Sequence, residues 1–333
     1  MSKSAGRTMQ PSRRKVLQAA GGAFALSVLS RVARAQNYPS RPVHIVVGFP
    51  PGGPTDIGAR LIGQRLAERL GQPFVIDNRP GAANNIATEA VAHAAPDGYT
   101  LLAAVGSNTI NPALYPDLGF NFIRDFAMVG GIYRSPLVLE VIASLPVKTV
   151  PELIAYAKAN PGKVTLASFG TGTVSHIAGV FFQMNAGIEL VHVPYRGSAP
   201  MVTDLIGGQV QAAFDNLPVS IPYINNGKLR ALGVTTARRW RTLPDVPTLA
   251  DYMPGFEATT WVGLAAPRQV PPAIVERLAS EIEGMLDDQN IIAHLATLGA
   301  EPFRLSTAAF DKFIVEQTEK WGRVIRAGNI KLE

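Results

Sequence analysis

The chain of 333 residues is too long for one compact core and fits two domains of ordinary size. Hydrophobic residues make up 47% of it and charged residues 17%, which excludes a disordered or coiled-coil protein. It contains no cysteine, so a disulfide scaffold, a Cys-ligated metal site and a cysteine nucleophile are excluded.

The net charge of +6 is concentrated in the first 35 residues, which hold seven of the 31 basic residues and no acidic one. The rest of the chain has 24 basic against 25 acidic residues, so it has no general attraction for nucleic acid. Ser12-Arg13-Arg14-Lys15 is a twin-arginine signature, and Ala33-Arg34-Ala35 offers small residues to a signal peptidase. The apolar stretch between them is shorter than the roughly 20 residues that span a bilayer. We therefore expect a twin-arginine-type signal peptide over 1–35, cleaved before Gln36, and a periplasmic protein; the general secretory route is the alternative.

Short strands and helices alternate along the remaining chain. A helix with Ile57, Leu61 and Leu66 on one face follows the first strand, and Gly71 stands where a helix ends. The predicted strands are 43–47, 74–76, 99–105, 138–142, 164–167, 190–193, 210–214, 229–234 and 261–265. The other predicted helices are 84–95, 151–159, 174–186, 199–206, 219–225, 273–287, 291–298 and 307–327. This alternation predicts the α/β class, with parallel sheets flanked by helices.

Two proline-rich stretches, Ser135–Pro151 and Leu243–Pro254, interrupt the alternation and are candidate crossings between two α/β lobes. If both are crossings, the first lobe is discontinuous and comprises 36–134 plus 256–333. The second lobe is then the central insert, 135–255, and a cleft lies between the two lobes.

Five predicted strand-to-helix loops share one chemistry, since each is built from Gly, small hydroxyl residues and Asn. They are the segments 49–56, 79–85, 105–109, 168–176 and 195–200. Such loops lie at the carboxyl ends of parallel strands, where ligands bind, and each leads into a helix N-terminus that attracts an anion. The loops therefore predict a small-anion site shared by both lobes. The candidate ligand contacts are Gly52, Gly53, Thr55, Asp56, Ser107, Ser168, Thr171, Thr173, His176, Arg196 and Asp215.

Two of these candidates have a structural alternative. Asp56 falls in the first turn of a helix, where a carboxylate stabilises the N-terminal dipole, and Asp215 can hold a loop amide at the end of its strand.

Motifs for catalysis and cofactors are incomplete. The chain lacks the Gly-Lys-Ser/Thr of a P-loop, and Ser168 lacks the first Gly of a nucleophile elbow. The five histidines show no metal-ligand spacing. We expect no catalytic residue, no cofactor and no metal. The alternative is a periplasmic hydrolase or transferase that uses His176 with Ser168 or Asp215.

Several motifs, in this order, resemble the Bug-type substrate-binding proteins, the extracytoplasmic receptors of tripartite tricarboxylate transporters. They are Val47-Gly48-Phe49-Pro50-Pro51-Gly52-Gly53-Pro54-Thr55-Asp56, Asn78-Arg79-Pro80-Gly81-Ala82, Ala95-Pro96-Asp97-Gly98-Tyr99, His192-Val193-Pro194-Tyr195-Arg196-Gly197 and Leu243-Pro244-Asp245-Val246-Pro247-Thr248. One segment departs from the family: Ala82-Ala83-Asn84-Asn85 stands where a Gly-rich sequence is usual.

The resemblance implies a two-lobe periplasmic-binding-protein fold of the type II-like, flytrap kind. It implies a receptor that binds a small carboxylated metabolite between its lobes, with the loops 52–56 and 168–176 meeting the carboxylate. The expected partners are the small organic acid and a tripartite-type membrane permease or a sensor kinase, with no nucleic acid. A monomer is expected.

Overall fold

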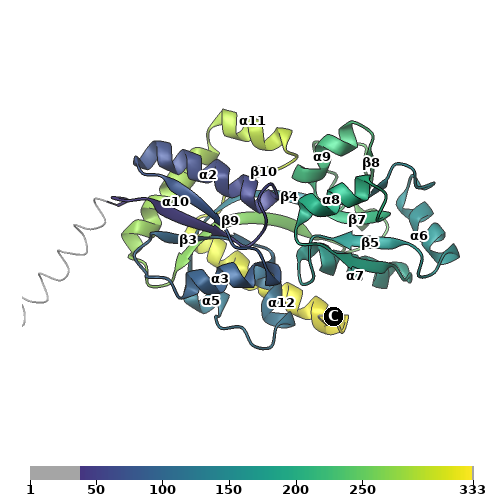
Figure 1. Ribbon diagram of the computed structural model, residues 1–333, viewed down its shortest axis with the longest axis horizontal. Coiled ribbons are helices and arrows are strands. Elements are labelled where there is room, and N and C mark those ends of the chain that lie inside the picture. The colour runs from purple at the N-terminus through teal and green to yellow at the C-terminus, as the bar shows by residue number, and fades with distance from the viewer. Residues whose placement is uncertain (1–37, 332–333) are drawn as a thin grey trace, which may run out of the picture.

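The computed structural model describes residues 38–331, so the predicted signal peptide and its cleavage site lie outside the described residues (Figure 1). Among those residues, no helix combines the length and the apolar character needed to cross a membrane.

Two sheets, flanked by helices, share one long strand (Figure 1). The first sheet contains β1 (Val43–Val47), β2 (Phe74–Asn78), β3 (Thr100–Val105), β9 (Thr259–Pro267), β10 (Glu301–Pro302) and the first part of β4 (Phe126–Ile142). The second contains the rest of β4 with β5 (Thr165–Ser168), β6 (Val191–Pro194), β7 (Ala212–Asn216) and β8 (Leu229–Val234).

Helices connect the strands in both parts of the molecule. Those connected with the first sheet are α2 (Pro54–Leu70), α3 (Asn85–Ala92), α4 (Ser107–Leu114), α5 (Phe122–Asp125), α10 (Pro272–Leu286), α11 (Gln289–Thr297) and α12 (Thr307–Ala327), with a 3-10 turn at Ala82–Asn84. Those of the second are α6 (Val150–Ala159), α7 (Val174–Ala186), α8 (Ser198–Ile206) and α9 (Leu217–Asn225), with a 3-10 turn at Leu249–Asp251.

Helix ends follow local sequence signals. The Thr173 hydroxyl accepts the His176 N–H at the start of α7, and Gly187 ends that helix in the left-handed region. Ser306 caps α12 in the same way. Both helices have the bounds that the sequence predicts.

Strand β4 passes from one sheet to the other. It pairs with β9 up to Pro136, and with β7 and β8 from Leu137 onward. The sequence predicted only its last five residues as strand, because Gly130-Gly131 and Ser135-Pro136 interrupt the apolar pattern of the first part. Pairs of β4 and β9 are antiparallel, while β1 and β5 pair in parallel with both of their neighbours. The α/β class is confirmed. Both sheets are mixed because β4, which runs through both, and β9, in the first sheet, pair antiparallel with their neighbours.

Helix α12 contributes to the hydrophobic core of both parts. Phe310 and Ile314 pack in a core with β3 and β9, whereas Trp321 and Ile325 pack with residues of β5 and β7. Its C-terminal end therefore joins the two parts, in addition to β4.

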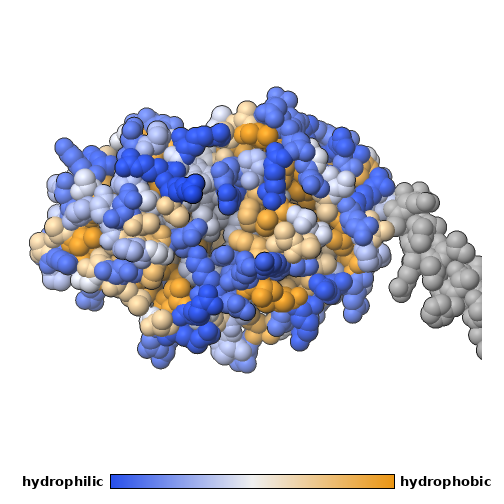
Figure 2. Space-filling model, turned by 180° about the vertical axis from the view of Figure 1, so that it is seen from behind, coloured by the Kyte–Doolittle hydropathy of each residue, from blue (hydrophilic) through white to orange (hydrophobic). Residues whose placement is uncertain are grey.

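Large hydrophobic residues on the surface are scattered. Figure 2 shows one face, on which hydrophobic residues form small patches separated by hydrophilic ones. The exposed large hydrophobic side chains belong to different elements: Val75, Ile86, Ile123, Met184, Val191, Tyr252 and Val315. Isolated residues of this kind need no partner to cover them.

Candidate functional site

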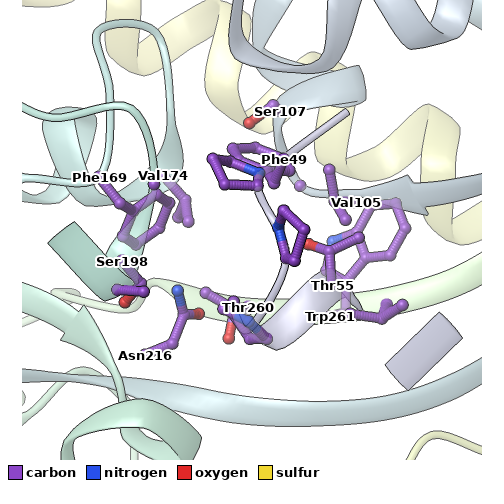
Figure 3. A pocket seen from close by; sticks show the side chains of 18 of the residues that line it. Phe49, Thr55, Val105, Ser107, Phe169, Val174, Ser198, Asn216, Thr260 and Trp261 are labelled. Carbon is purple, nitrogen blue, oxygen red and sulfur yellow. The ribbon is translucent and has the colours of Figure 1, made fainter. Parts of the chain in front are cut away.

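A narrow cavity lies where loops of the first and second sheets face each other (Figure 3). Its volume of about 40 Å³ has room for a carboxylate-sized group or a few water molecules. Figure 3 shows Thr55, Val105 and Trp261 opposite Phe169, Ser198 and Asn216. The other lining residues are Phe49, Pro50, Pro51, Gly53, Pro54, Gly106, Ser107, Tyr133, Val174, Gly197, Ala199, Pro200, Thr260 and Val262.

Helix N-termini from both parts of the molecule converge on this narrow cavity, which we call the cleft cavity. The starts of α2 (Pro54) and α4 (Ser107) face it from one side, and those of α7 (Val174) and α8 (Ser198) from the other. No charged side chain is among the lining residues. The first N–H groups of a helix have no partner within the helix and carry partial positive charge. The cavity can therefore bind an anion through backbone N–H groups, without a positively charged side chain.

Two hydroxyl groups and one indole N–H in the lining of the cleft cavity have no hydrogen-bond partner among the described residues. The side chains of Thr55 and Ser107 are 5% and 3% exposed, and neither makes a hydrogen bond within 38–331. The Trp261 N–H likewise donates to no other described residue. The structure thus brings together the predicted Gly53, Thr55 and Ser107 and leaves donors available to a ligand.

Sequence reasoning missed Asn216 and Trp261. Asn216 directly follows β7 and precedes α9, so the strand-to-helix rule that selected the other loops could have found it. Trp261 has no such signal, because it lies inside β9 and reaches the cavity only through the strand pairing.

Asp56 stabilises the loop before α2 and does not line the cavity. Its carboxylate accepts hydrogen bonds from the Gly52 N–H, Arg60 and Asn78. Burial raises the pKa of Asp56, but these hydrogen bonds outweigh it and hold the pKa below its ordinary value. Gly52 itself is exposed, with a φ of +81°, and is also absent from the cavity lining.

Ser168 and His176 line a separate small hollow behind the loop 168–176. Ser168 pairs with His192 at 2.7 Å, and the rings of His176 and His192 are stacked with centroids 4.4 Å apart. Burial, together with His192, lowers the pKa of His176 to about 4, so this ring is neutral at neutral pH. Its Nδ1 accepts the Gly172 N–H, which orders the loop.

A second, larger cavity of about 650 Å³ adjoins the first and shares Phe49, Pro50, Phe169 and Gly197 with it. It contains three of the predicted contacts, Thr171, Thr173 and Arg196. Thr173 donates to the Gly170 carbonyl, whereas the side chains of Thr171 and Arg196 have no partner within 38–331. Arg196 is exposed and is the only charged side chain of this lining.

Ala82 and Ala83 line the larger cavity, and the segment Ala82–Asn84 has a backbone conformation that favours glycine. The φ angles of Ala82, Ala83 and Asn84 are +46°, +50° and +79°. An L-residue in this region costs about 1–2 kcal/mol. Hydrogen bonds from Asn84 to Asn108 and from Asn111 to the Ala83 carbonyl hold the segment in place.

A Cβ atom at Gly48 would lie 1.9 Å from Asn84 Oδ1, so this close approach requires glycine.

Asp215 is fully buried, and Ser198 and Ser220 donate hydrogen bonds to its two oxygens. It therefore lies one hydrogen bond behind the cavity wall, where Ser198 is a lining residue.

Comparison with known proteins gives one consistent result. The model of the tripartite tricarboxylate transporter family receptor matches residues 58–330. Protein BugT of Bordetella pertussis is 34% identical over 322 residues, which are 96% of this chain and 99% of BugT.

Two solved structures with a bound acid are also similar. The first is Rpa4515 of R. palustris with adipate, at 38% identity and a TM-score of 0.86; the match covers 88% of this chain and 99% of Rpa4515. The second is MatC from Rhodopseudomonas palustris with bound malate, at 33% identity and a TM-score of 0.82, over 86% of this chain and all of MatC.

Proposed function

Because the chain belongs to the receptor family of the tripartite tricarboxylate transporters, we propose that it captures a small carboxylated metabolite in its cleft and delivers it to a membrane permease of that type. The resemblance to Bug-type receptors is thereby confirmed. The family consists of periplasmic substrate-binding receptors and not of enzymes. The hydrolase alternative also finds no support in the geometry, since Ser168 pairs with His192 and not with His176.

The convergence of helix N-termini on a cavity without charged side chains carries this proposal. A carboxylate in the narrow cavity receives N–H groups from α2, α4 and α8 and hydroxyl donors from Thr55 and Ser107. Such charge-assisted hydrogen bonds are worth roughly 1.5–3 kcal/mol each. The remainder of the ligand extends into the larger cavity, whose volume is in the range of ordinary ligand sites.

Closure of two lobes around the ligand is part of the proposal. The change of pairing partner between Pro136 and Leu137 supports a first crossing in β4. The sequence predicted Leu243–Pro254 as the second crossing. We propose that this crossing lies just before β9, and the packing of Phe256 and Ala258 in the core of the second sheet supports this position. Ligand contacts with both lobes favour the closed state.

Direct binding measurements test the proposal. Calorimetry and native mass spectrometry of the exported protein with adipate and malate are expected to show one ligand bound and recovered unchanged. Failure of a panel of mono-, di- and tricarboxylates to bind, or turnover of any of them, would contradict it.

Substitution of Ser107 by alanine is expected to weaken the binding of such an acid about tenfold, because one donor to the carboxylate is lost. Calorimetry measures the change in Kd, and Ser144→Ala is the control, since Ser144 is exposed in a turn far from the cavity lining. Equal affinity of the Ser107→Ala and Ser144→Ala proteins would remove Ser107 from the site.

Substitution of Thr171 by valine tests whether the ligand reaches the larger cavity. The two side chains have nearly the same shape, so the fold is expected to be unchanged while affinity falls several-fold through loss of one hydroxyl. An unaltered Kd would place the ligand in the narrow cavity alone.

A further inference from the structure

A buried carboxyl group interrupts the apolar sequence of β4. Glu140 stands between Leu139 and Val141 and is 0% exposed. The Ser220 Oγ lies 2.9 Å from Glu140 Oε1 and 2.9 Å from Asp215 Oδ2, and Ser198 donates to Asp215 Oδ1. A hydrogen-bonded chain therefore runs from Glu140 through Ser220 and Asp215 to Ser198 in the cavity wall. We call these four residues the acid chain.

No cationic side chain of the described residues neutralises the acid chain. Neither acid takes part in an ion pair within residues 38–331. The charged side chains on the neighbouring elements bond elsewhere: Arg230 of β8 donates to three backbone carbonyls and Asp204 of α8 accepts from Tyr195. Helix α9 and strand β7 add no other charged side chain. Two adjacent buried carboxylates without a cation cannot both be ionised, so the pair holds a proton.

The hydrogen-bond pattern places this proton on Glu140. A serine hydroxyl has one proton, so Ser220 donates to only one of the two acids and accepts from the other. Asp215 receives hydrogen bonds from Ser198 and from the Asn216 N–H as well, which favours its ionised form. The Oε2 atom of Glu140 has no hydrogen-bond partner among the described residues. Glu140 is therefore the neutral acid, donating to Ser220, which donates to Asp215.

Burial and the charges of the two groups agree with this assignment. Burial, followed by the negative charge of Asp215, raises the pKa of Glu140 well above its ordinary value. Burial raises the pKa of Asp215 to about 6 against the opposing hydrogen bonds. Glu140 is thus assigned the proton of the pair, and Asp215 its negative charge.

We propose that the acid chain is a proton-binding site that couples capture of an anionic ligand to the uptake of one proton. This inference rests on the proposed function. Ionised Asp215 lies behind Ser198 at the start of α8, where it repels a second anion in the cavity. A carboxylate bound there increases the affinity of Asp215 for a proton from solvent, and protonation removes the repulsion. Affinity for the anion is thus higher below the titration range of Asp215 than above it.

Infrared spectroscopy of the ligand-free protein tests whether Glu140 carries the proton. At neutral pH, the C=O stretch of a neutral carboxylic acid is expected in the native protein and is expected to be lost in Glu140→Gln, which keeps the size and shape of the side chain. Ser144→Ala is expected to retain the band. An unchanged band in a folded Glu140→Gln protein would overturn the acid chain.

Calorimetry with adipate tests the coupling. Between about pH 7.5 and about pH 5.5, the affinity of the native protein for adipate is expected to rise about fivefold, with at most one proton taken up per ligand. The heat of binding then depends on the buffer. In Glu140→Gln a neutral amide replaces a neutral acid and Asp215 stays buried, so the rise is expected to persist. In Asp215→Asn the titrating group is gone, and the affinity is expected to be the same at both pH values.

Each outcome of the calorimetry supports or overturns the coupling of ligand binding to proton uptake. Constant or falling affinity of the native protein at the lower pH overturns the coupling, as does an equal rise in Asp215→Asn. If neither adipate nor any other acid of the carboxylate panel binds at either pH, the proposed function fails and the coupling with it, while the infrared band still shows whether Glu140 holds the proton.

Discussion

Replacement of Trp261 by alanine is expected to lower the free energy of unfolding by about 3–5 kcal/mol. The indole is 2% exposed, and the rings of Phe310 and Phe313 meet it edge-on, each with a centroid distance of 5.5 Å. Truncation leaves a cavity beneath the ligand site that the paired strands around β9 are unable to fill. Denaturant unfolding followed by circular dichroism measures the loss.

Two further variants separate the roles of Trp261. Tyr252→Ala removes an aromatic ring that is 41% exposed, and its expected effect on stability is about 0.5 kcal/mol or less. Trp261→Phe keeps most of the packing but lacks the N–H, so it reports on ligand affinity more than on stability. A loss of less than about 1 kcal/mol in Trp261→Ala would show that the ring does not support the fold.

Replacement of Gly197 by valine is expected to weaken ligand binding at least tenfold, about 1.4 kcal/mol, by keeping the cleft from closing. Gly197 has a φ of +113°, and a Cβ atom there would lie 3.1 Å from Cδ of Pro50 on the other side of the cleft. The variant is thus strained in its backbone and obstructed across the cleft. Calorimetry with adipate gives the affinity, and thermal unfolding shows whether the fold persists.

Controls distinguish obstruction from strain. Gly227 also has a positive φ, +75°, but nothing lies within 4 Å of a Cβ there, so Gly227→Val is expected to cost stability without changing affinity. In the Gly197→Val protein, a second change of Pro50 to alanine is expected to restore part of the affinity. Equal affinities of the Gly197→Val and native proteins would show that the two loops do not meet in the bound state.

Helix bounds were predicted from the local sequence where the periodicity and the caps lie within the helix or next to it. The bounds of α7 and α12 follow from hydrophobic periodicity and from the caps at Thr173 and Ser306. Strand β4 shows the opposite case, since its first part is held by pairing with β9 and carries no regular apolar alternation. The first three residues of α4 were predicted as part of the loop 105–109, and no helix was predicted over 110–114, because Asn, Thr and Pro are weak helix formers.

The predicted site residues also fall into two groups, those that line the cleft cavity and those that do not. Glycine and hydroxyl loops at the ends of strands singled out Gly53, Thr55 and Ser107 as ligand contacts, and all three line the cleft cavity. The same rule also selected Ser168 and His176, which face a different hollow, because the rule identifies the edge of a sheet and not the direction of a side chain. Asp56, in the first turn of α2, shows that a carboxylate next to the cavity can have its hydrogen bonds within the fold and not with a ligand.

By itself, the sequence determined the α/β class, the family, and the accumulation of helix N-termini suited to an anion, since these depend on local periodicity, composition and motif order. Only the tertiary structure decided which of those loops share a cavity and that Trp261 and Asn216 join them. It also brought Glu140 against Asp215, 75 positions along the chain. The physical reason is that contacts across β4, β7 and β9 are set by strand pairing between distant segments, which no local pattern in the chain encodes.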